Sequence, residues 1–232
     1  SAGWARWVLE RRYGQPVSAV RTSALRRVDL TRFDVVVLPS GDYGDAIGPS
    51  LVTKLRSWVE GGGTLVALGE AARWLTRDKV ELLATTAQLR DGRPDVEPEP
   101  ADAKKAEGRP AKDKDTKPEP FDLEKAIQPE RERPDAVPGA QLRLNLDAEH
   151  WLSAGSDEEI YAIVESQRVF SPLKLDKGTN VGVYAKKDEV VGSGLVWDDV
   201  RDLLAQKAFL MHQPVGDGRR RDRAHTRNPR RG

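Results

Sequence analysis

The chain has 232 residues with no cysteine, one methionine and three histidines. Without thiols it can form neither a disulfide nor a thiolate metal site, and it has no cysteine nucleophile. No stretch approaches the roughly 18 apolar residues of a membrane-spanning helix. The first residues lack the long apolar segment of a signal peptide, and the chain does not start with methionine. We therefore expect a fragment that begins inside a longer gene product, or a chain that begins after processing.

The few histidines argue against a metal centre built from this chain alone. His150, His212 and His225 are scattered, and no His-x-x-Glu or His-Glu-x-x-His spacing is present. Metal ligation needs several donors that converge on one point. The sequence therefore predicts no cofactor in this chain.

The net charge of +1 conceals an uneven distribution of charge. Residues 219–232 contain seven arginines and one aspartate, a local charge of +6, so the rest of the chain sums to −5. Such a segment could neutralise the phosphates of a nucleic acid or an anionic surface. It has no interleaved aromatic residue for stacking on bases. We therefore predict a disordered Arg-rich tail and no nucleic-acid partner.

A strand, a helix and a second strand form the clearest local pattern. Residues 33–38 and 64–68 are short continuous apolar runs, which are typical of parallel strands covered on both faces. Between them, the apolar residues of 51–59 recur at helical spacing, and glycines at 61–63 end that helix. This βαβ unit predicts an α/β domain whose active-site position would lie just past the strand ends.

Weaker patterns predict further elements. In the first half we expect helices over 4–13 and 70–76, a helical turn over 24–28, a short strand over 17–20 and a helical or mixed piece over 78–89. In the second half we expect strands over 141–147, 168–173, 179–185, 190–197 and 207–213. A hairpin turn is predicted over 186–189, and a helix N-capped by Asp198 over 198–205.

The composition changes sharply over residues 90–138. This stretch contains nine of the 15 prolines, one aromatic residue and dense alternating charge, so it has little apolar surface to offset the entropy of ordering. We predict disorder over about 92–118 and one or two helical turns over 121–127. The expected organisation is 1–89 and 139–218 as two halves of one α/β domain with an open, mostly parallel sheet and a hairpin-rich second half. Residues 90–138 are then a disordered insertion, and 219–232 the tail.

Polar residues follow both strands of the βαβ unit. Ser40 and Asp42 lie in the loop after the first strand, which could bind an anion or a sugar through backbone N–H groups, or simply connect two elements. Glu70 follows the second strand in the first turn of a helix, where a carboxylate interacts favourably with the helix dipole. Asp176 and Asn180 belong to another polar loop, which could bind a ligand or join two strands.

An independent serine hydrolase is an alternative. Open sheets can place a nucleophilic serine at a sharp strand-to-helix turn, in a Gly-x-Ser-x-Gly motif. Residues 68–72 instead read Leu-Gly-Glu-Ala-Ala. Ser40 or Ser193, acting with a histidine of the second half, remains a candidate nucleophile that no motif supports.

Several stretches resemble the domain that follows the peptidase unit in large bacterial M14-type zinc carboxypeptidases. They read Gly-Trp-Ala-Arg-Trp-Val-Leu-Glu at 3–10, Asp-Val-Val-Val-Leu-Pro at 34–39 and Trp-Val-Glu-Gly-Gly-Gly-Thr-Leu-Val-Ala-Leu-Gly at 58–69. Residues 150–152, 170–183 and 194–197 resemble the same proteins. The similarity covers roughly 3–218 apart from the insertion.

This resemblance implies a flavodoxin-like or class I glutamine amidotransferase-like fold, joined to an upstream peptidase domain that binds zinc. It also implies a periplasmic or extracellular protein. The family's zinc ligands and catalytic glutamate have no matching segment here, and Gly69 and Glu70 stand where an amidotransferase would have its cysteine. We therefore expect a non-catalytic accessory domain that positions substrate or binds peptide or cell-envelope material.

The sequence departs from the family pattern at both ends. The family would have a further strand before Gly3 and an apolar strand after Gly218, where this chain has its arginine-rich segment. Our hypothesis is that a frameshift produced the segment, and resequencing the gene would test it.

Overall fold

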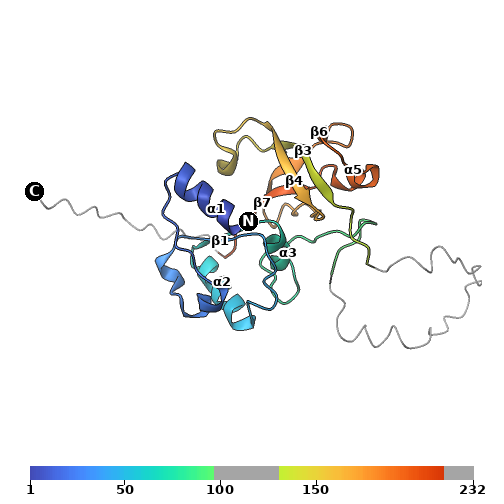
Figure 1. Cartoon of the computed structure of the whole chain (residues 1–232). Helices are drawn as coiled ribbons and strands as arrows, with labels where there is room; N and C mark the ends of the chain where they lie inside the picture. Colours follow the sequence, from blue (N-terminus) through green and yellow to red (C-terminus); the bar gives the residue numbers. More distant parts are fainter. Residues whose placement is uncertain (97–130, 217–232) are drawn as a thin grey trace, which may run out of the picture. The chain divides into compact units, whose positions relative to one another are not determined.

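The computed structural model describes residues 1–96 and 131–216 (Figure 1), and the chain divides into two compact units. The first unit consists of Ser1–Leu75 with the chain from Gln213 onward, and the second of Thr76–His212. Most of the predicted disordered insertion, the helical turns expected over 121–127 and the arginine-rich tail lie outside the described residues. None of the described helices is long and apolar enough to cross a membrane.

The first unit begins with short helical pieces. Helix α1, Ala2–Trp7, continues as a π-helical segment over Val8–Arg12, and 3₁₀ turns follow at Thr22–Arg27 and Leu30–Arg32. The helix predicted over 4–13 and the turn over 24–28 are therefore present. The strand predicted over 17–20 is wrong: this segment is irregular and mostly exposed, without a partner strand among the described residues.

The predicted βαβ unit is present. Strands β1, Val35–Leu38, and β2, Thr64–Ala67, pair in parallel, and α2, Pro49–Glu60, connects them. Pro49 occupies the first turn of α2, where its missing N–H costs nothing, and the helix buries Leu51, Val52 and Leu55. Helix α3, Glu70–Leu75, follows β2 as expected. In the described residues this parallel sheet has two strands, so the first unit does not display a wide open sheet.

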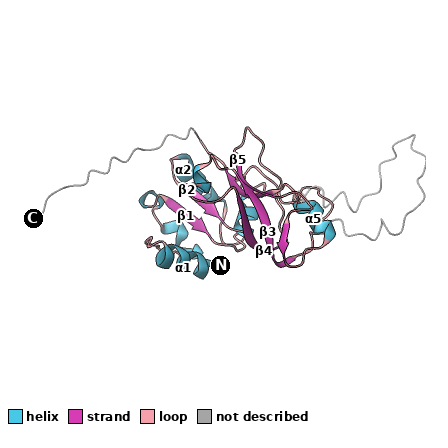
Figure 2. Ribbon diagram, turned by 90° about the horizontal axis from the view of Figure 1, so that it is seen from above, coloured by secondary structure: helices cyan, strands magenta, loops and turns pink. Residues whose placement is uncertain are grey.

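The second unit is built on a curled antiparallel sheet, and one open, mostly parallel sheet is not confirmed. Its strands are β3 (Val137–Leu146), β4 (Glu159–Ser166), β5 (Thr179–Tyr184), β6 (Val191–Ser193) and β7 (Ala208–His212). The order is β4-β3-β5-β7, with β6 also paired to β3. Figure 2 shows β3, β4 and β5 as neighbouring arrows. The fold is therefore mixed α/β.

The predicted hairpin over 186–189 is wrong. Strands β5 and β6 do not pair with each other, because both run antiparallel to β3 along the same edge: Leu144 faces Tyr184, and Leu142 faces Val191. The intervening turn leaves this edge and returns to it without reversing the chain. Ten-residue β3 is long enough to accept both short strands in succession.

One face of this sheet forms the core of the second unit. Side chains of β3 and β4 alternate in burial, and the inward ones pack with α5, Asp198–Leu204. Trp197, not the predicted Asp198, is the N-cap of α5. The strand predicted over 168–173 reduces to one residue, Phe170, bridged to Ala87 and Ala208. The piece expected over 78–89 contains no helix.

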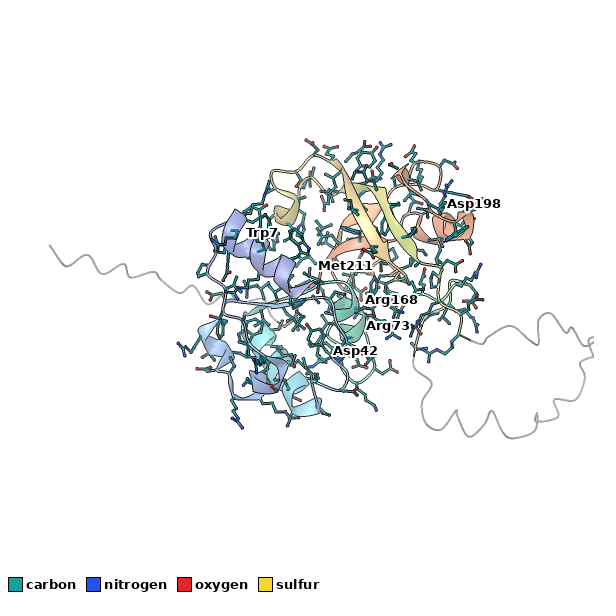
Figure 3. The ribbon with its side chains drawn as sticks, in the orientation of Figure 1. Trp7, Asp42, Arg73, Arg168, Asp198 and Met211 are labelled. Atoms are coloured by element: carbon teal, nitrogen blue, oxygen red, sulfur yellow. The ribbon has the colours of Figure 1, made fainter. Side chains whose placement is uncertain are left out.

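Ion pairs hold residues on either side of the undescribed segment 97–130 close together. Arg131 pairs with Asp95, whose side chain is only 4% exposed and lies 3.7 Å from Nη1 of Arg168 (labelled in Figure 3). Arg90 Nη1 lies 2.7 Å from Oε1 of Glu132, and the Arg90 N–H donates to the Glu132 carbonyl. The described residues on the two sides of this segment are therefore held together within the folded unit.

Candidate functional site

Ser40, at the carboxyl end of β1, has structural partners. Its Oγ accepts a hydrogen bond of 3.2 Å from the backbone N–H of Glu70, the first residue of α3. Its carbonyl oxygen accepts one of 2.9 Å from Oγ of Ser1. Ser40 therefore joins the ends of both strands to the start of the chain.

Gly69 leaves no room for a side chain at the second strand-to-helix turn. Its φ of +54° is a left-handed conformation that L side chains rarely adopt, and a Cβ built on it would lie 2.7 Å from Oγ of Ser40. Glu70 is half-buried at the start of α3, as predicted. The structure thus brings Ser40 and Glu70 together, in an arrangement that closes the turn.

The loop with Asp42 is closed by its own side chains. Oδ1 of Asp42 (labelled in Figure 3) accepts a 2.9 Å hydrogen bond from the N–H of Gly44. The hydroxyl of Tyr43 donates to the carbonyl of Pro39 at 2.8 Å, and its ring packs against Trp74. Burial raises the pKa of Tyr43, so the phenol stays protonated and keeps this bond.

The polar loop of the second unit is also fixed internally. The amide of Asn180 accepts from the N–H of Leu173 at 2.8 Å and donates to its carbonyl at 2.9 Å, as a paired strand residue would. Asp176 is exposed and pairs with its neighbour Lys177 at 3.4 Å. Asn180 therefore has a structural role, while Asp176 remains available at the surface.

Within the second unit, the structure separates Ser193 from His212. Ser193 faces Gln141 in the β6–β3 pair. His212 instead pairs with Thr179 of β5, and Thr179 lies three residues before Gly182, which faces Leu146 at the other end of β3. The five residue-to-residue steps from Gln141 to Leu146 already span roughly 17 Å, so Ser193 cannot reach His212 for proton transfer. Among the described residues of the first unit, which contains Ser40, there is no histidine.

Two histidines that are 62 positions apart in sequence meet at one end of the sheet of the second unit. Nε2 of His150 lies 3.0 Å from Nδ1 of His212, and Nδ1 of His150 accepts from the N–H of Leu152 at 3.1 Å. The ring of Trp151 stacks on His150 and meets His212 edge-on, with both centroids at 5.7 Å. Trp151 is nevertheless 64% exposed.

The hydrogen bonds of this cluster assign its proton positions. Because Nδ1 of His150 is an acceptor, neutral His150 has its proton on Nε2 and donates to Nδ1 of His212. His212 then has its proton on Nε2. Burial, and secondarily the neighbouring His150, lower the pKa of His212, which favours the neutral form of His212 that accepts this bond.

This arrangement suits an uncharged ligand better than a metal ion. The bonded nitrogens have no lone pair left for a metal while both bonds persist, and the part of the chain described contains no group of three or more candidate metal ligands. An exposed indole beside an N–H donor can stack on the apolar face of a ring and bind its polar groups.

Sequence reasoning did not anticipate this cluster. Its residues come from the turn after β3 and the end of β7, which only the antiparallel pairing of β5 with β7 and β3 brings near each other. The one available signal was the adjacent His150 and Trp151 directly after a predicted strand. Comparisons of the chain with protein-family models, with curated proteins and with solved structures found no match.

Proposed function

We propose that this chain is a non-catalytic accessory domain of a zinc carboxypeptidase-like protein, which holds peptide or cell-envelope material for a peptidase domain upstream in the same polypeptide. In this proposal the first unit belongs to a flavodoxin-like or class I amidotransferase-like sheet, and the parent protein is periplasmic or extracellular. Zinc would reside in the peptidase domain. The resemblance in sequence over 3–10, 34–39 and 58–69 is the basis for the family.

The closed turn at Ser40, Gly69 and Glu70 is the observation that best supports a non-catalytic role. A nucleophile at this turn needs an exposed side chain between the strand and the helix. Here the turn contains Gly69, whose Cβ position is occupied by Ser40, and the Ser40 hydroxyl is engaged by the Glu70 amide. Cysteine chemistry is excluded by composition.

Activity measurements test this proposal directly. The full chain is incubated with a peptide library and with glutamine, with and without a chelator, and separately with a fluorophosphonate probe. We expect neither turnover nor labelling. Turnover that survives repurification and chelator, or stoichiometric labelling that is lost in Ser40→Ala or Ser193→Ala, would contradict the proposal and favour the hydrolase alternative.

A sugar-binding module is a second candidate, favoured by the cluster of His150, Trp151 and His212. Its exposed indole is the kind of surface on which a sugar ring stacks. Thermal unfolding of the chain with soluble envelope oligosaccharides tests it, because a ligand that binds only the folded state raises the melting temperature. Trp151→Ala should abolish the rise, while Trp197→Ala, another exposed tryptophan of the second unit, should keep it. A rise that persists in Trp151→Ala would exclude the cluster.

A further inference from the structure

Strand β4 forms one edge of the antiparallel sheet. It is eight residues long, contains no proline, and among the described residues it pairs only with β3. Edge strands usually have features that block pairing with another chain, such as lysine, proline or a short length. This strand has none of the three, so its outer edge is competent to accept a further strand.

The hydrogen bonds of the ladder show which residues face that edge. The N–H of Leu146 donates to the carbonyl of Glu158 at 2.7 Å, which fixes the alternation in this antiparallel pair. Backbone groups of Ile160, Ala162 and Val164 therefore point to β3. Those of the four intervening residues point outward: Glu159, Tyr161, Ile163 and Glu165.

The same four residues place their side chains on the open face of the sheet. Ile163 is 76% exposed and Tyr161 58%, between the exposed Glu159 and Glu165. The Tyr161 ring lies over Gly192, where a Cβ would come within 2.3 Å of Cε1, so glycine at this position leaves room for the ring. The edge thus presents two apolar side chains bracketed by two carboxylates.

Charge identifies the occupant. Residues 157–165 contain four acidic residues and no basic one. Glu159 already pairs with Arg143 of β3, but the edge stays net acidic, so a complementary strand would be basic at its ends and apolar at its centre. A second copy of the chain fits poorly, because full antiparallel self-pairing would set Glu159 against Glu165 twice, and like charges opposite each other destabilise a sheet. The arginine-rich tail offers the charge but no alternating apolar residues.

We propose that β4 binds an extended basic–apolar peptide by strand addition. The peptide would add antiparallel to β4, with arginine or lysine opposite Glu159 and Glu165 and β-branched residues opposite Tyr161 and Ile163. Its pattern is therefore a basic residue, two apolar residues and a basic residue at positions 1, 3, 5 and 7. The strand-addition proposal deepens the proposed function by naming the class of peptide that the domain holds. It rests on the proposed function only in regarding that peptide as substrate.

Fluorescence anisotropy of the full chain with a labelled heptapeptide, Arg-Thr-Val-Thr-Val-Thr-Arg, tests the proposal. We expect saturable binding of this peptide. The same peptide with glutamate at both arginine positions should bind at least about tenfold more weakly. Ile163→Pro should abolish binding while the fold persists, because the N–H it removes points to the free edge and not to β3. Circular dichroism checks that fold.

A charge exchange keeps the test decisive if the proline variant does not fold. Glu165→Lys, whose side chain is exposed, should weaken binding of the basic peptide and strengthen that of a peptide with glutamate at position 1. Equal affinity for both peptides, unchanged binding by Ile163→Pro, or self-association of the chain through β4 would overturn the proposal. So would probe binding that appears only when residues 217–232 are removed. Binding without turnover supports both this inference and the accessory role, whereas cleavage of the bound probe would refute the accessory role alone.

Discussion

Replacing Gly69 by alanine tests the geometry on which the non-catalytic role depends. A non-glycine residue in the left-handed conformation costs about 1–2 kcal/mol, and forcing a methyl group against a packed neighbour typically costs about 1–3 kcal/mol more. The new Cβ would lie 2.7 Å from Oγ of Ser40 and 3.0 Å from its Cβ. We therefore expect Gly69→Ala to reduce the free energy of unfolding by about 2–5 kcal/mol.

Two matched variants separate the cost of the left-handed conformation from the cost of the steric clash. Gly14 has a similar φ of +62° with nothing within 4 Å of its built Cβ, so Gly14→Ala should show only the conformational cost. Ser40→Gly removes the atoms that clash, and alone should cost about 1 kcal/mol for the lost bond to Glu70. The double variant Ser40→Gly with Gly69→Ala should then recover about 1–3 kcal/mol relative to additivity.

Urea unfolding followed by tryptophan fluorescence measures these differences, and hydrogen exchange of residues 64–75 localises them to the turn. The reasoning is refuted if Gly69→Ala costs no more than Gly14→Ala. It is also refuted if the Gly69→Ala loss is the same with and without the Ser40 side chain, because residue 69 could then accommodate a reactive group.

Three further predictions concern the second unit. Asp95→Asn should lower its stability by about 3 kcal/mol in urea unfolding, since two arginines lose a buried counter-charge, whereas the exposed control Asp135→Asn should cost under about 1 kcal/mol. The pKa of His212 is lower in the folded chain, so the unfolded chain binds more protons near pH 6. The free energy of unfolding should therefore fall as the pH drops from 7.5 toward 5.5, and His212→Gln should flatten that dependence on pH. If the predicted disorder over 92–118 holds, replacing 97–130 with a six-residue Gly/Ser linker should raise the free energy of unfolding by about 1.5 kcal/mol; a loss would mean that the segment packs on the unit.

The βαβ unit could be predicted because its signals are local. Two apolar runs, helical spacing between them and glycines at the helix end all lie within residues 33–68. Strand β4 was missed although Ile160, Ala162 and Val164 alternate inward. Its outward positions Tyr161 and Ile163 are also apolar, so the period of two that marks a half-buried strand is obscured.

Other features depend on pairings that no local pattern encodes. A polar turn after β5 predicts chain reversal, but the unoccupied length of β3 determines that β6 continues in the same direction. The contact of His150 with His212 requires the whole strand order of the second unit. Ser40 and Glu70 could be predicted to lie together, because the carboxyl ends of parallel strands share one sheet edge, but their mutual bond could not.

The interrupted strand formed by β5 and β6 has a practical consequence. The backbone of Arg143 accepts from the N–H of Ala185 at 3.0 Å and donates to the carbonyl of Val190 at 2.8 Å, so a single residue anchors both stems of the turn at 186–189. Extra sequence spliced between those stems would project outward without disturbing either anchor. This turn is thus a natural attachment point for an epitope or a fluorescent reporter, on the strand edge opposite the one that faces β4.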